Sequence, residues 1–255
     1  MKKNLLATIG SLIVRKLLVK SGLRITRPGP YGVFDFESFL CRHLEVHGTL
    51  NFVQIGANDG VMNDPIYRFI QKNKDKVSGF VLEPLPDIFS TLVMNYQSFP
   101  RIKPLNLAIH NSETEMLLYR VKSEYLSNVP AFARGIASFD PNHWKKTLLI
   151  TDSSYIQSEN VKCVSYSQLL RDYEITKIDL LLIDTEGYDY EILMGIDLNN
   201  LKPRIIRFEH GVRDSVMSES NFIEIVARLN SYGYQIMAES YDATAYLLHP
   251  KDLIF

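Results

Sequence analysis

The sequence predicts an α/β protein whose mixed, mostly parallel sheet carries helices on both faces. Residues 50–55 form an apolar run broken only by Asn51 and Gln54, and a turn with glycines at positions 56 and 60 follows it. Residues 66–70 then show a helical pattern, so this stretch predicts a strand, a glycine turn and a helix. Strand and helix patterns alternate downstream, which is typical of parallel strands joined by right-handed crossovers. Two strand patterns around Tyr241 and Asp242 predict an antiparallel hairpin at the end of the chain.

The remaining elements follow the first strand in order. Pro65 suits the first position of the first helix, where Asn63 or Asp64 can cap the free amides. Strand patterns occur at residues 79–83, 101–109, 114–121, 161–164, 178–183, 204–208, 234–238 and 243–248, and helical patterns at residues 87–96, 167–173, 188–194 and 219–231. Residues 122–160 show no lasting period but are rich in aromatic residues. We therefore expect an ordered lid inserted into the domain there.

The composition is ordinary for a soluble globular protein, with 255 residues, 46% hydrophobic and 22% charged. A net charge of −1 gives no case for nucleic-acid binding, which usually needs a basic excess. Cys41 and Cys163 form no metal-ligand pattern and fit a reducing compartment. No apolar run reaches the ~18 residues of a membrane span, so we expect a cytoplasmic protein.

The N-terminal segment differs from the rest, because its seven basic residues all precede the first acid, Asp35. It fits a signal peptide, a basic amphipathic helix held on the inner face of a membrane through residues 1–27, or a helix packed on the domain or in a dimer. Prolines 28 and 30 break the chain, and residues 34–47 show a helical pattern. We expect a helical N-terminal extension over residues 1–47 and one domain over residues 48–255.

Polar residues follow five of the predicted strands. In chain order these strand ends carry Gly56 and Asn58, then Glu83, then Asn106, then Asp184 and Glu186, and lastly Glu209 and His210. Because ligands of open parallel sheets bind beyond the carboxyl ends of the strands, these residues predict a site. A carboxylate at position 83, after the second strand, can accept both hydroxyls of a ribose. The turn lacks the third glycine of a dinucleotide fingerprint and the Lys-Ser/Thr of a P-loop.

Four stretches resemble the FkbM-type S-adenosylmethionine-dependent methyltransferases. They read QIGANDG at residues 54–60, LEP at 82–84, NLAI at 106–109 and IDLLLIDTEGYDYEIL at 178–193. The resemblance covers about residues 48–248 and implies a class I (Rossmann-like) fold with a seven-stranded sheet. It also implies O-methylation of a sugar, glycan or secondary-metabolite hydroxyl. Gln54 departs from the family, which often carries an acid at this position.

The strand ends and the resemblance together give the expected cofactor contacts. S-adenosylmethionine is expected to meet Gln54, Gly56, Asn58, Asp59, Gly60, Glu83, Pro84, Asn106, Ala108 and Asp184. The glycine turn is expected to lie beneath the amino-acid end of the cofactor, with Asn58 or Asp59 touching it.

Methyl transfer to a hydroxyl requires a group that removes the proton of the acceptor. His210 is the first candidate for this base, and His143 in the predicted lid is the second. The carboxylates Asp184, Glu186 and Glu209 could instead hold a Mg²⁺, bind the acceptor or orient His210. The aromatic residues Phe139 and Trp144 could stack on a sugar.

Two other classes of function stay open at this point. An NAD-dependent oxidoreductase of related fold would need a fuller glycine fingerprint. A non-catalytic S-adenosylmethionine-binding module would not need the carboxylates. The sequence does not identify the acceptor or the oligomeric state.

Overall fold

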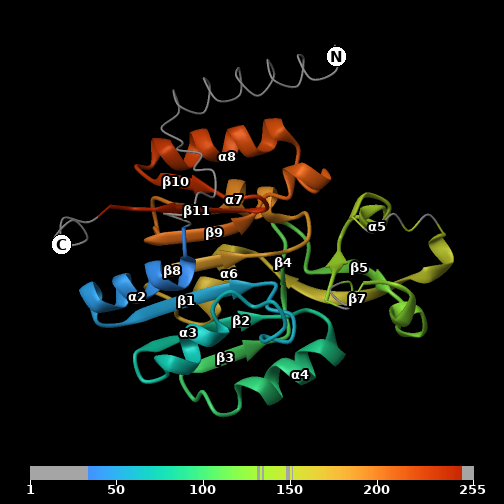
Figure 1. Ribbon diagram of the computed structural model, residues 1–255, viewed down its shortest axis with the longest axis horizontal. Coiled ribbons are helices and arrows are strands. Elements are labelled where there is room, and N and C mark those ends of the chain that lie inside the picture. Colours follow the sequence, from blue (N-terminus) through green and yellow to red (C-terminus); the bar gives the residue numbers. More distant parts are fainter. Residues whose placement is uncertain (1–33, 131–132, 134, 148–149, 151, 249–255) are drawn as a thin grey trace.

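The computed structural model describes residues 34–130, 133, 135–147, 150 and 152–248. Its main sheet has seven strands in the order β10-β11-β9-β8-β1-β2-β3 (Figure 1). These strands are β1 (Leu50–Ile55), β2 (Val77–Leu82), β3 (Ile102–Leu105), β8 (Leu180–Ile183), β9 (Ile205–Glu209), β10 (Gln235–Ala238) and β11 (Asp242–Tyr246). Only β11 runs antiparallel to its neighbours, so the predicted mixed sheet with a terminal hairpin is confirmed.

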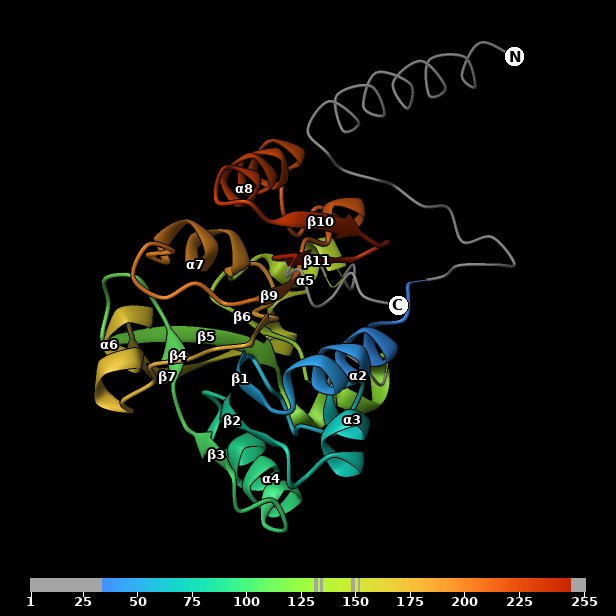
Figure 2. The ribbon, with the colours of Figure 1, turned by 90° about the vertical axis from the view of Figure 1, so that its left-hand side faces the viewer.

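Helices cover both faces of this sheet (Figure 2). They are α2 (Phe36–His47), α3 (Tyr67–Lys72), α4 (Pro86–Tyr96), α6 (Tyr166–Asp172), α7 (Asp189–Gly195) and α8 (Glu219–Ser231). Alternate residues of β8 separate the two cores, since side chains of a strand point to opposite faces. Leu180 and Leu182 pack with α2, α3 and α4, whereas Leu181 and Ile183 pack with α6, α7 and α8.

A smaller sheet lies beside the edge at which the parallel strands end (Figure 1). Its order is β4-β7-β5-β6, from β4 (Ala108–Ile109), β5 (Glu115–Val121), β6 (Ala137–Ser138) and β7 (Ile156–Val164). Residues 122–160, which the sequence presents as a lid, contribute β6, the helix α5 (His143–Thr147) and the first half of β7. Trp144 is fully buried there with Val121 and Ile136, so it is a core residue and offers no face to a sugar.

Two local expectations change. The strand pattern at residues 101–109 is divided, because the chain leaves the main sheet after Leu105 and joins the small sheet at Ala108. Pro65 precedes the first helix and is not its first residue, since α3 begins at Tyr67. Asp64 does cap this start as expected, because its Oδ1 accepts the amides of Ile66 and Tyr67 at 2.8 and 2.6 Å.

The N-terminal expectations fall on residues 1–27, outside the described residues. The helix that follows, α2, is amphipathic and buries Phe36, Leu40 and Leu44 in the same core as β1. Across the described part of the chain, no helix has the length and apolar character needed to cross a membrane.

The register of the parallel strands aligns their carboxyl ends. Ile55 is paired with Leu82 on one side and with Ile183 on the other. Leu82 is in turn paired with Leu105, and Ile183 with Phe208. The residues that follow all five strands therefore stand at one level, as the sequence predicts.

Gly56 lets the ends of β1 and β8 approach at backbone distance. Its φ of +82° lies in the left-handed region, and a Cβ added there would lie 1.7 Å from the carbonyl oxygen of Asp184. Any side chain at this position would therefore push β8 away from the turn.

Replacing Gly56 with alanine is expected to destabilise the protein by more than the ~1–2 kcal/mol that a left-handed backbone costs an L-residue. The additional loss comes from the collision with Asp184. The matched control is Gly48→Ala, because Gly48 has a φ of +80° and nothing within 4 Å of an added Cβ. Urea denaturation of both variants checks this, and equal losses would contradict the role given to the Asp184 contact.

Candidate active site

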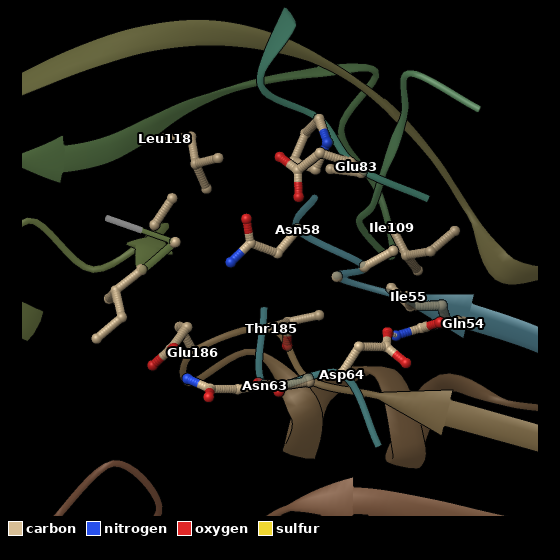
Figure 3. A pocket seen from close by; sticks show the side chains of 18 of the residues that line it. Gln54, Ile55, Asn58, Asn63, Asp64, Glu83, Ile109, Leu118, Thr185 and Glu186 are labelled. Atoms are coloured by element: carbon tan, nitrogen blue, oxygen red, sulfur yellow. Dashed lines mark hydrogen bonds between the residues drawn. The ribbon is translucent and has the colours of Figure 1, made fainter. Parts of the chain in front are cut away.

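A pocket opens at the aligned strand ends, between the main sheet and the small sheet (Figure 3). Of the predicted site residues, Gln54, Gly56, Asn58, Glu83, Pro84, Ala108, Asp184 and Glu186 line it. The pocket lining does not include Asp59, Gly60, Asn106, His143, Glu209 or His210. The structure thus brings together most of the expected cofactor contacts but only part of the expected catalytic group.

Glu83 presents a buried carboxylate to the pocket, with 6% of the residue exposed. Burial raises its pKa to about 7, although the backbone amides of Leu85 and Asn58 oppose the shift. The amide of Leu85 donates to Glu83 Oε1 at 2.8 Å. Asn106 lies behind this turn, where its Nδ2 donates to the carbonyl oxygens of Glu83 and Pro84 at 2.9 Å each. Asn106 therefore fixes the turn and does not face the pocket.

The glycine turn holds its two polar side chains differently. Asn58 has a φ of +50° and faces the pocket in Figure 3, where its side chain packs directly against Gly135. Asp59 turns toward its own backbone, because its Oδ1 accepts the amides of Val61 and Met62 at 2.8 and 2.7 Å. Asn58 is therefore the one of the two that the pocket exposes to a ligand.

A second carboxylate, Asp64, lines the pocket beside Gln54. Gln54 Nε2 donates to Asp64 Oδ2 at 2.7 Å, and burial raises the pKa of Asp64. Gln54 Oε1 is buried and has no hydrogen-bond partner among the described residues. The sequence identified Asp64 only as a helix cap. The available clue to the pairing was a polar residue, Gln54, inside a buried strand, with the acid Asp64 ten positions later.

Acidic side chains also gather at the ends of β8 and β9. Asp184 is exposed to solvent, but desolvation by the surrounding protein and then repulsion from Glu186 raise its pKa above the ordinary value. Burial and then the charge of Asp184 raise the pKa of Glu209 in the same way. Asp189 organises the loop, because its Oδ2 accepts the amide and hydroxyl of Thr185 and its Oδ1 accepts the amide of Glu209.

The two candidate histidines lie in different surroundings. His143 is 2% exposed on α5, and its Nε2 lies 3.2 Å from Oε2 of Glu186, which does line the pocket. His210 packs on Phe222, and its ring nitrogens lie 3.3 Å from the amide nitrogen of Val212 and 3.3 Å from the carbonyl oxygen of Glu239. Burial lowers the pKa of His210. His143 therefore lies directly behind the pocket wall, whereas His210 is held by the C-terminal hairpin.

The arrangement of side chains does not support the expected Mg²⁺ site. Among the residues the structure describes, no group of three or more His, Cys, Asp or Glu side chains is placed to hold a metal ion. Asp184, Glu186 and Glu209 therefore do not form a Mg²⁺ site in this structure.

Comparison with known proteins gives the family. The model of the methyltransferase FkbM domain matches residues 54–236. The chain belongs to this family. It is an S-adenosylmethionine-dependent methyltransferase of class I fold, and the order of its seven strands agrees with that fold. The alternative of an NAD-dependent oxidoreductase has no support. No curated protein matches the chain.

Solved structures with a similar fold are distant in sequence. An FkbM methyltransferase from Methylobacillus flagellatus is 14% identical, with a TM-score of 0.45, over 78% of this chain and 44% of that chain. The fibrillarin pre-rRNA processing protein of Methanococcus jannaschii is 13% identical, with a TM-score of 0.40, over 79% and 68%. Human methyltransferase 10 domain containing protein is 12% identical, with a TM-score of 0.41, over 94% and 96%.

The residues of this FkbM methyltransferase fit S-adenosylmethionine. Glu83 and Asp64 line the pocket with carboxylates that could accept hydrogen bonds from hydroxyl and ammonium groups of such a cofactor. Gln54 Oε1 supplies a further buried acceptor without a partner of its own. The cofactor carries the hydrogen-bond donors and positive charges that these groups lack.

The Glu83 carboxylate should destabilise the cofactor-free protein at alkaline pH. Its pKa is raised on folding, so its contribution to stability is present below the unfolded value near 4.5 and is lost as pH rises through about 7. Glu83→Gln should therefore raise the free energy of unfolding by about 3 kcal/mol at pH 8 but by less than about 1 kcal/mol at pH 5. Urea denaturation at both pH values measures this difference. The control is Glu124→Gln at an exposed site, and a gain at pH 8 no larger than the control's would contradict the burial argument.

Proposed function

We propose that this FkbM methyltransferase transfers a methyl group from S-adenosylmethionine to a hydroxyl oxygen of a sugar, glycan or secondary-metabolite acceptor. The observation that carries the proposal is the approach of the buried His143 Nε2, which makes no hydrogen bond among the described residues, to within 3.2 Å of Oε2 of Glu186 at the pocket wall. It joins an imidazole to a carboxylate at the strand end next to the expected cofactor site. Such a pair suits the removal of a proton from a weakly acidic hydroxyl.

The cofactor is expected to bind between Glu83 and Asp64, which lie on opposite sides of the pocket in Figure 3 with Asn58 between them. Glu83 accepts the two ribose hydroxyls, and Asp64 accepts the ammonium group. Ile109 and Leu118 provide apolar surface within the same pocket for the adenine. Asp184 and Glu186 line the same pocket, where the acceptor would lie.

The chain then has two tasks in the reaction. S-adenosylmethionine supplies an electrophilic methyl group on a positively charged sulfur. Glu186 accepts the proton of the acceptor hydroxyl, and His143 lies behind it with its Nε2 3.2 Å from the Glu186 carboxylate. Asp184 lines the pocket next to Glu186, where it can hydrogen-bond to the acceptor and orient it. The Ser138 hydroxyl donates to the carbonyl oxygen of Glu186 at 2.7 Å and so holds the loop in place.

The two carboxylates assigned to the cofactor can be separated with a ligand that lacks the amino acid. Glu83→Ala should weaken binding of both S-adenosylmethionine and 5′-methylthioadenosine at least tenfold, because both contain the ribose. Asp64→Asn should weaken only S-adenosylmethionine, again about tenfold, because only that ligand carries the ammonium group. Isothermal titration calorimetry measures all four affinities.

Asp75→Asn serves as the control, since Asp75 is exposed on the loop before β2. If Asp64→Asn weakens both ligands equally, Asp64 does not bind the amino-acid end. If the unmutated protein binds no S-adenosylmethionine, the proposed site is wrong.

The base can be tested by methyl transfer from radiolabelled S-adenosylmethionine to the glycan and small-molecule fraction of a cell extract. His143→Ala and Glu186→Gln should each lower transfer by about 100-fold or more, with cofactor affinity unchanged within about twofold. His210→Gln should retain transfer, because the His210 ring is held by the hairpin and Phe222. Loss of transfer only in the His210 variant would restore His210 as the base. Binding without any transfer by the unmutated protein would favour a non-catalytic module.

A further inference from the structure

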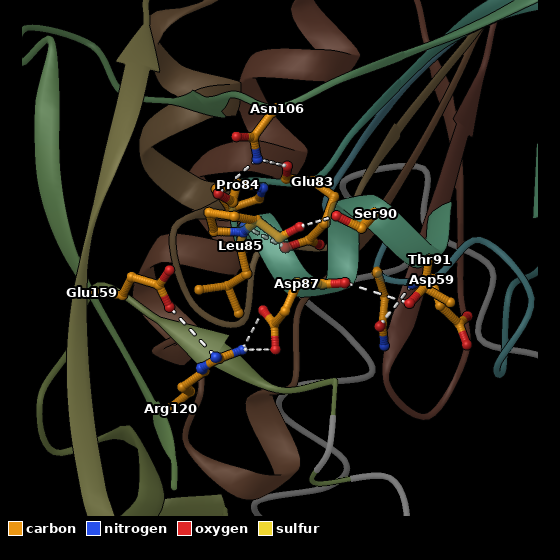
Figure 4. A network of polar contacts seen from close by, with 12 residues as sticks. Asp59, Glu83, Pro84, Leu85, Asp87, Ser90, Thr91, Asn106, Arg120 and Glu159 are labelled. Atoms are coloured by element: carbon orange, nitrogen blue, oxygen red, sulfur yellow. Dashed lines mark hydrogen bonds and ion pairs between the residues drawn. The ribbon is translucent and has the colours of Figure 1, made fainter. Parts of the chain in front are cut away.

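Arg120 of β5 connects the small sheet to the first turn of α4 (Figure 4). Its Nη1 donates to both carboxylate oxygens of Asp87, at 2.8 and 2.9 Å. Its Nη2 lies 3.4 Å from Oε2 of Glu159 on β7. The arginine side chain is 17% exposed, whereas that of Asp87 is 62% exposed, so water screens the Arg120–Asp87 pair from one side only.

The turn that Arg120 contacts is the one that carries Glu83. Asp87 lies in the first helical turn of α4, and the residue before that helix, Leu85, donates its amide to Glu83. Leu85 is 1% exposed and packs in one apolar cluster with Leu118 of β5. The small sheet therefore contacts residues 83–87 through an apolar contact and an ion pair at the same time.

The ion pair also sets the charge around Glu83. Besides burial, the negative charge of Asp87 raises the pKa of Glu83, and the positive charge of Arg120 lowers it. Although burial opposes it, the hydrogen bond from Arg120 keeps the pKa of Asp87 below its usual value. Asp87 is thus ionised next to Glu83, and Arg120 compensates its charge.

We propose that Arg120 is a positioning residue for the cofactor, which fixes the turn of residues 83–87 against the small sheet and balances the charge of Asp87 beside Glu83. The inference rests on the proposed cofactor role of Glu83. It gives the small sheet a part in cofactor binding, although Arg120 itself does not line the pocket.

The test compares two substitutions that weaken the same ion pair from opposite sides. Arg120→Gln leaves the charge of Asp87 uncompensated, so Glu83 should protonate at higher pH. The pH midpoint for loss of S-adenosylmethionine binding should then rise by roughly 0.5 unit or more. Asp87→Asn removes the repulsive charge and leaves Arg120 in place, so the same midpoint should fall. A purely structural role for the ion pair predicts shifts of one sign in both variants.

Two further variants serve as comparisons for the shift in the pH midpoint. Arg120→Lys keeps the charge but loses the bidentate contact, so it should restore the midpoint while leaving affinity weaker than in the unmutated protein. Arg101→Gln is the control, because Arg101 is exposed and its side chain donates to a backbone oxygen of Asp75. Calorimetric titrations between pH 5.5 and 8.5, with binding sites counted in each, supply the midpoints.

The proposal on Arg120 can be judged separately from the proposed function. Titration of the Glu83 carboxyl carbon by NMR in the cofactor-free protein should show the same opposite shifts in the two variants. If the unmutated protein binds no S-adenosylmethionine, the proposed function fails, and the cofactor role of Arg120 fails with it. If binding occurs but the midpoints shift in one direction or stay unchanged, Arg120 does not act on Glu83 and only the inference fails.

Discussion

The contact between the backbone at Gly56 and the carbonyl of Asp184 determines how this site is built. Two adjacent parallel strands end at the same level, and the absence of a side chain at Gly56 lets the two loops beyond them touch. The turn of residues 57–60 and the segment of residues 184–186 consequently form one continuous wall. Without that approach, the cofactor residues of the first loop and the acidic residues of the second would belong to separate surfaces.

The wall collects carboxylates in a setting that disfavours their charge. Burial raises the pKa of Asp64 and Glu83, and the crowding of acids at the ends of β8 and β9 raises that of the exposed Asp184. A ligand with a sulfonium, an ammonium group and two ribose hydroxyls relieves both effects. The buried carboxylates thus lower the stability of the free protein and raise its affinity for a cationic cofactor, as is common at functional sites. Arg120, which lies outside the pocket, reduces the loss of stability near Glu83 by compensating the charge of Asp87.

The sequence was sufficient for the main sheet and its binding edge. Buried strands of 178–183 and 50–55 stand out through their apolar runs, and parallel register then places Glu83, Asp184 and Glu186 at one edge. Side-chain direction could not be read in this way. His210 follows a strand as Glu83 does, yet the hairpin draws its ring away from the pocket.

Partners that lie far apart in sequence were also beyond the sequence pattern. The pairing of β5 with β7 joins residues about forty positions apart, so the stretch between them reads as aperiodic although it folds on its own core around Trp144. His143 reaches Glu186 only because this core carries α5 back to the sheet edge. Asp64 was recognised as a helix cap, and its second role depends on the side chain of Gln54.

A crystal structure with bound S-adenosylhomocysteine tests the central claim most directly. The account predicts both ribose hydroxyls within hydrogen-bond distance of Glu83, the ammonium group against Asp64, and the sulfur facing Asp184 and Glu186. A ligand bound elsewhere, or one turned so that its ammonium group meets Glu83, would contradict it.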